Sequence, residues 1–203
     1  METRELPLSE LLEEKARSEK ACRLAEKDPK LAFVLAQQVR DPWYRCQVLA
    51  YVAKRETDVQ AKLRIIQHAF DAAKLTNEPN RIVSVSSWPI EVLVEIGEEE
   101  CVEKEVNRLL HVIAAEPHPT RRGDAILMLL LKLVKGPPKS LVAVFDAFLT
   151  ACLVGHGWKR DRNLRDAAVF LGQMGLNREK DMCIAQIENQ RVKRQAIKKG
   201  SAQ

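Results

Sequence analysis

Residues 28–58 read DPKLAFVLAQQVRDPWYRCQVLAYVAKRETD, and this stretch holds the clearest helix starts of the chain. Asp28-Pro29 and Asp41-Pro42 each place a side-chain acceptor at the N-cap position and a proline at the first helical position, where a missing N–H costs nothing. After Asp58, apolar residues recur at helical spacing: Val59, Leu63, Ile66, Phe70 and Ala73. Such a stripe can lie only on one side of an α-helix. The stretch therefore predicts three successive helices.

The same kind of pattern continues on both sides of this stretch. Residues 125–134 are apolar nearly all round, as expected of a helix that is enclosed by neighbours. Connections of two to five residues favour antiparallel neighbours. Pro89 predicts a kink or a break after Ser87. Taken together, stripes and breakers predict about ten helices, at 9–26, 29–39, 42–55, 58–75, 79–97, 98–115, 120–135, 138–154, 159–174 and 177–197.

Composition agrees with a compact helical protein. The chain has 203 residues, of which 46% are hydrophobic and 30% are charged, and its eight glycines and 5% aromatic residues argue against a β-sandwich or barrel. The longest apolar run, residues 125–131, is too short to cross a bilayer, so no membrane partner is expected.

Five cysteines without a C-x-x-C pair fit neither a disulfide framework nor a zinc ribbon. They are predicted to be core thiols in a reducing compartment. The glutamates near the N-terminus occupy the place where an export signal would need a basic and then an apolar run. These features predict a cytoplasmic protein.

A faint internal repeat accompanies the helices. Four similar segments place leucines at Leu49, Leu93, Leu131 and Leu171, and each is followed by a second amphipathic helix, which gives a unit of about 40 residues. Over residues 9–197 the chain resembles the HEAT/armadillo-like class of α-helical repeats. The resemblance implies an all-α fold, an α-solenoid of about five antiparallel helical hairpins in a HEAT-like superhelix. Residues 1–197 would form one domain, and residues 198–203 a frayed tail.

Catalytic signatures are missing from the sequence. It has no glycine-rich nucleotide loop, no G-x-S-x-G and no H-E-x-x-H, and its four histidines stand apart. The acidic cluster of residues 98–105 fits the first turn of a helix, where the dipole favours carboxylates. We therefore predict no catalytic residue, no metal ligand and no cofactor.

Basic residues and tryptophans gather near the predicted helix starts. A helix start is already electropositive, so this placement costs stability unless an anion or a carboxylate lies opposite. Stacked hairpins would bring equivalent starts to one edge, and local aspartates could instead neutralise the arginines in pairs. The candidate binding residues are Trp43, Arg45, Arg81, Trp88, Arg121, Arg122, Trp158, Arg160, Arg162 and Arg165.

Charge is concentrated at the C-terminal end. The net charge is +5, and residues 156–203 hold eleven Lys/Arg against five Asp/Glu. Residues 191–199 hold five bases and no acid. This segment is either an arm for a polyanion or an exposed last turn of helix.

These observations favour a protein-interaction scaffold over an enzyme. Its curved helical-repeat surface would use arginine and tryptophan anchors for an acidic or extended protein partner. One alternative is a nucleic-acid-binding HEAT-like protein that contacts phosphates through the basic helix starts and the C-terminal helix. Because the resemblance also includes DNA glycosylases and lyases, a HEAT-fold enzyme of that kind is a second alternative.

Overall fold

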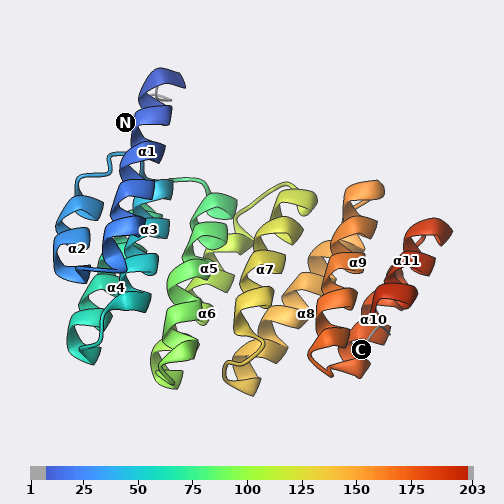
Figure 1. The fold of residues 1–203 in the computed structure, drawn as a ribbon. Helices are drawn as coiled ribbons and strands as arrows, with labels where there is room; N and C mark the ends of the chain where they lie inside the picture. The colour runs from blue at the N-terminus through green and yellow to red at the C-terminus, as the bar shows by residue number, and fades with distance from the viewer. Residues whose placement is uncertain (1–7, 201–203) are drawn as a thin grey trace. The chain divides into compact units, whose positions relative to one another are not determined.

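The computed structural model describes residues 8–200, and these form eleven α-helices and no strand (Figure 1). The predicted all-α class is therefore confirmed. The chain divides after Asn77 into two compact units, the first with α1–α4 and the second with α5–α11. The helices are α1 (Leu8–Ala25), α2 (Pro29–Gln37), α3 (Pro42–Arg55), α4 (Val59–Lys74), α5 (Pro79–Glu95), α6 (Glu99–Ala114), α7 (Pro119–Leu133), α8 (Pro138–Val154), α9 (Trp158–Gln173), α10 (Asn177–Gln186) and α11 (Gln190–Gly200).

In the first unit, the predicted helix starts are confirmed. Asp28 accepts a hydrogen bond from the backbone N–H of Leu31 (3.0 Å), and Asp41 accepts one from the N–H of Tyr44 (2.9 Å). Asp58 caps α4 in the same way. Helix α3 packs against α1, α2 and α4, and its buried residues form the centre of this unit.

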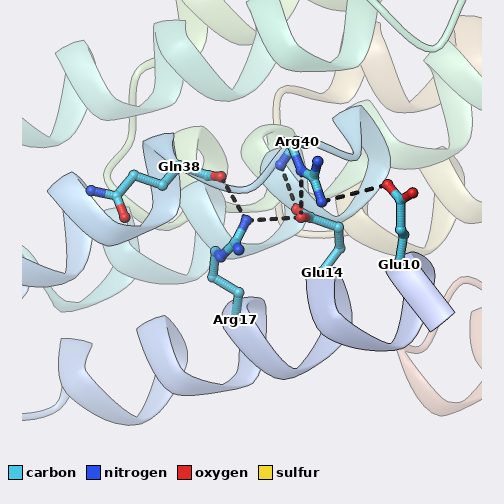
Figure 2. A network of polar contacts seen from close by, with 5 residues as sticks. All are labelled: Glu10, Glu14, Arg17, Gln38 and Arg40. Carbon is cyan, nitrogen blue, oxygen red and sulfur yellow. Dashed lines mark hydrogen bonds and ion pairs between the residues drawn. The ribbon is translucent and has the colours of Figure 1, made fainter. Parts of the chain in front are cut away.

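A buried carboxylate fastens α1 to the connection between α2 and α3 (Figure 2). The Glu14 side chain is fully buried and accepts hydrogen bonds from the backbone N–H of Arg40 (2.5 Å), from Arg40 Nε (3.0 Å) and from Arg17 Nη1 (2.8 Å). Arg17 also donates to the carbonyl of Gln38 (3.2 Å), and Arg40 reaches Glu10. One carboxylate thus joins α1 to a connection that lies 26 residues later in the sequence.

In the second unit, the helices lie in two layers. Helix α7 packs between α5 and α9, and α11 packs on α9; α8 packs between α6 and α10 in the other layer. Helices α5, α7 and α9 run in the same direction and begin at one edge of this unit (Figure 1). The starts that carry the predicted site residues of this unit are therefore neighbours.

The prediction of one continuous helix over 177–197 is wrong, because residues 187–189 divide this segment into α10 and α11. Two buried residues in the first turn of α9 hold this break. Arg160 donates to the carbonyl of Gln186 (2.7 Å), and Asp161 accepts from the backbone N–H groups of Asn189 (2.7 Å) and Glu188 (3.4 Å). Backbone groups that would bond within a continuous helix are instead bonded by side chains.

Residues 198–200 of the predicted tail belong to α11, and residues 201–203 lie outside the described residues. No break follows Ser87, because α5 continues through Pro89. Val85 and Leu93, four residues on either side of Pro89, are buried in the core. Cys101 is exposed, so the prediction of a core thiol is wrong at that position.

Helix α11 runs parallel to α9 at very close range. Asn189 lies against Asp161, and at the other end the backbone oxygen of Gly200 lies only 2.7 Å from where a Cβ on Gly172 would stand. Gly172→Ala is expected to lower the free energy of unfolding by about 1–2 kcal/mol, because the added methyl group forces the two backbones apart. Urea unfolding measures this change.

Gly123→Ala is the matched control for this substitution. Gly123 is also buried within a helix, but its added Cβ would meet side chains at ordinary contact distances of 3.6 and 3.9 Å. Helix propensity favours alanine there, so we expect no change or a gain of up to about 1 kcal/mol. Equal effects of the two substitutions would contradict a close α9–α11 contact.

Candidate interaction surface

The start of α9 presents the most exposed large hydrophobic side chain among those that the structure describes. Gly157 precedes the helix with φ of +80°, a left-handed conformation that glycine adopts without strain. Trp158 follows, and 65% of its surface is exposed. The Arg162 guanidinium carbon lies 5.3 Å from the centre of its ring, and Lys159 Nζ lies 5.9 Å away. We call Trp158, Lys159 and Arg162 the Trp158 patch.

Contacts with α7 hold this patch in place. The carboxylate of Asp124 on α7 accepts a hydrogen bond from Asn163 Nδ2 (2.6 Å) and lies 3.5 Å from Arg162 Nη2. Asn163 is buried, so this bond fixes the spacing of the two helices. Arg162 therefore lies between a carboxylate and the tryptophan ring, in an orientation that favours a cation–π contact.

The two arginines at the start of α7 have different environments. Arg122 donates twice to the carbonyl of Glu116, at 3.1 and 2.5 Å, and so closes the connection between α6 and α7. Arg121 is exposed, and within the described part of the chain no ion pair holds it. Of these two predicted site residues, Arg121 is the one whose charge faces solvent.

Trp88 lies at a second aromatic contact, between α5 and α7. Lys132 Nζ stands 5.1 Å from the ring centre of Trp88 and pairs with Glu91 at 2.9 Å. Trp88 is half-buried, and its indole Nε1 is buried with no hydrogen-bond partner among the described residues. Lys132 is not among the predicted site residues. Its partner Glu91 lies 41 residues earlier in the sequence, a separation close to one repeat, which is the signal that could have indicated this contact.

The other predicted arginines of this unit are engaged within it. Arg160 is buried and pairs with Glu188 at 2.5 Å. It therefore anchors the segment before α11 and does not belong to an exposed surface. Arg165 makes two hydrogen bonds to Asp166, at 2.9 and 2.7 Å. Arg81 lies 3.9 Å from Glu78. Local pairing, which the sequence left open, accounts for most of these charges.

Trp43 and Arg45 belong to the first unit, near the start of α3, and both are half-buried. The surface described above is built by α5, α7 and α9.

Several hollows lie in the surface of the described residues. The best-formed one, of about 190 Å³, lies between α8 and α10 and is lined by apolar residues such as Phe145 and Met182. None of the four best-formed hollows between residues 8 and 200 is lined by tryptophan.

Within residues 8–200, no three His, Cys, Asp or Glu side chains lie where they could share a metal ion. No helix in that range combines the length and the apolar character that crossing a bilayer requires.

Comparison with known proteins found no matching family model, no similar curated protein and no similar solved structure.

Proposed function

We propose that this chain is a HEAT-like helical-repeat scaffold whose Trp158 patch binds an acidic or extended segment of a partner protein. The observation that carries the proposal is the exposure of Trp158, 65% of whose surface faces solvent although two cations lie beside its ring. Tryptophan and arginine are the residues that most often dominate protein interfaces. A ring that is already held by its neighbours loses little side-chain entropy when a partner covers it.

Contacts one repeat apart support the HEAT-like part of the proposal. Glu91 and Lys132 are separated by 41 residues, and Asp124 and Asn163 by 39. Both pairs join neighbouring helices of one layer, as equivalent positions of stacked hairpins would. The α-solenoid of about five hairpins remains the arrangement that we propose for the chain.

The charge pattern favours a protein over a nucleic acid at this surface. Asp124, Asp166 and Glu91 lie beside the cations and pair with Arg162, Arg165 and Lys132. These paired carboxylates reduce the net positive charge on which binding of a phosphate backbone depends, whereas mixed charge around an aromatic residue is ordinary at protein interfaces. The enzymatic alternative depends on a pocket that gathers a carboxylate, a tryptophan and an arginine, and we do not propose it.

Selection from a library of random 12-residue peptides on the intact protein tests this function. We expect enrichment of peptides that combine acidic residues with an apolar residue. Trp158→Ala should weaken the enriched peptides at least about tenfold, because the anchor of the interface is removed. Fluorescence anisotropy of the labelled peptides measures the affinity.

Leu153→Ala is the control for this substitution. Leu153 is a similarly exposed apolar residue of the same unit, at 58%, and it lies on α8, outside the patch. Its replacement should change peptide affinity less than twofold. Enriched peptides that bind Trp158→Ala as tightly as the original protein, or a selection that enriches nothing, would refute the proposed function.

A further inference from the structure

The solvent-facing side of α11 carries three cations at helical spacing. Arg191, Arg194 and Lys198 are all exposed, and positions three and four residues apart lie on one side of a helix. At a rise of about 1.5 Å per residue, they span roughly 10 Å. We call these three residues the α11 basic face.

These charges differ from Arg162 of the Trp158 patch because no carboxylate is paired with them. Residues 189–200 contain five bases and no acid, and within the described residues no ion pair joins Arg191, Arg194 or Lys198 to a carboxylate. Two acids of the preceding segment are paired with other cations, since Glu188 pairs with Arg160 and Asp181 lies 3.6 Å from Lys180. Like charges at this spacing repel one another until an anion arrives.

The helix that carries this face is firmly held. Asn189 caps its start by accepting from the N–H groups of Arg191 (3.0 Å) and Val192 (3.1 Å), and Asp161 of α9 holds the residues before it. Ala196 is fully buried, and Gly200 lies against Gly172. The basic face is thus displayed by an anchored helix, in which the positions of the cations are set before binding.

The chemistry of this face suits a phosphate backbone better than a bilayer or a protein. The apolar side of α11 is already used, because Val192 and Ala196 are at least half-buried, which leaves Ile197 as its exposed apolar residue. A helix that lies in a membrane surface needs a large apolar side that is open to lipid. A protein interface needs an apolar or aromatic centre, for which the exposed side of α11 offers only Ile197. Unpaired Arg and Lys at regular spacing are sufficient for phosphate contacts.

We propose that the α11 basic face is a second binding site, separate from the Trp158 patch, and that it binds the phosphate backbone of a nucleic acid. The contacts are charge-assisted hydrogen bonds from the three side chains to phosphate oxygens, and they do not read base sequence.

Binding of the intact protein to fluorescein-labelled DNA of about 20 nucleotides, single-stranded and duplex, tests this site. With three phosphate contacts, affinity for the single strand should fall about twentyfold between about 50 and 200 mM salt. The variant Arg191→Gln/Arg194→Gln/Lys198→Gln should lose at least about tenfold in affinity at the lower salt, and its salt dependence should nearly vanish.

Three controls distinguish this site from general charge and from the Trp158 patch. Lys20→Gln/Lys30→Gln/Lys104→Gln removes the same charge from exposed positions elsewhere and should change affinity less than threefold. Arg191→Lys/Arg194→Lys keeps the charges and should retain binding. Trp158→Ala should also leave DNA binding unchanged, so that failure of either proposal is visible without the other.

Several outcomes would overturn the proposal. They are absence of binding to both DNA forms at about 50 mM salt, equal losses in the two triple variants, and sedimentation with vesicles containing phosphatidylserine without any binding to DNA. The last result would assign the face to a membrane surface.

Discussion

Glu14→Ala is expected to lower the free energy of unfolding of the first unit by about 3 kcal/mol. The substitution removes the acceptor of the Arg40 N–H and of two guanidinium groups, and charge-assisted bonds of this kind contribute about 1.5–3 kcal/mol each when a buried partner is lost. Urea unfolding measures the change in a Trp88→Phe/Trp158→Phe background, where Trp43 of α3 is the tryptophan that reports.

Two comparison variants identify the cause. Glu14→Gln keeps the shape and one acceptor, so it should lose about half as much. Glu19→Ala removes an exposed carboxylate from the same helix and should change stability by less than about 0.5 kcal/mol. A loss at Glu19 as large as that at Glu14 would mean that the charge of α1, and not the buried network, matters.

The pH dependence of stability gives an independent reading of the same group. Burial raises the pKa of Glu14, but hydrogen bonds from Arg40 and the charge of Arg17 outweigh it, so the pKa lies below its ordinary value of 4.5. A folded-state pKa below the unfolded one stabilises the protein fully above about pH 4.5. That stabilisation is lost as pH falls through the folded pKa, and Glu14→Gln should remove this part of the acid dependence.

Asp161→Ala is expected to have a similar effect on the second unit, about 3 kcal/mol, and to release α11. The substitution leaves the N–H groups of Glu188 and Asn189 without their acceptor and leaves buried Arg160 with less negative charge nearby. Hydrogen exchange of the α11 amides should accelerate more than that of the α7 amides. This difference separates local release from general unfolding.

Asp161→Asn is the matched control, because an amide oxygen can still accept from one of the two N–H groups. It should retain at least half of the lost stability and most of the protection of α11. If Asp161→Ala leaves the exchange of α11 unchanged, packing of Ala196 and Gly200 alone would hold the helix.

Local rules were enough to place the helix starts of this chain. Asp28, Asp41 and Asp58 cap the helices that follow them, since an N-cap aspartate acts within three residues of its own position. The apolar stripe after Asp58 likewise predicted the buried side of α4 at Ile66, Phe70 and Ala73, whereas Val59 at its start is exposed. Features decided by neighbours in sequence were therefore predictable.

Features decided by distant residues were not predictable from local pattern. Glu14 stands in a run of glutamates that has the composition of a solvated helix, and its partner Arg40 is 26 residues away. Arg160 had the pattern of an exposed anchor, yet its partners at 186 and 188 bury it. Trp158 was predicted as a site residue, but its exposure follows from the Gly157 turn and the contacts between α7 and α9.

The first two turns of α9 carry two sets of residues that face different sides of the helix. Trp158, Lys159 and Arg162 face outward, whereas Arg160, Asp161 and Asn163 face inward. One residue inserted at the start of the helix would rotate the side chains after it by about 100°, which would turn Lys159 and Arg162 inward and Asp161 outward. Redesign of ligand preference should therefore randomise the outward positions, keep the inward ones constant and avoid any change in loop length before Trp158.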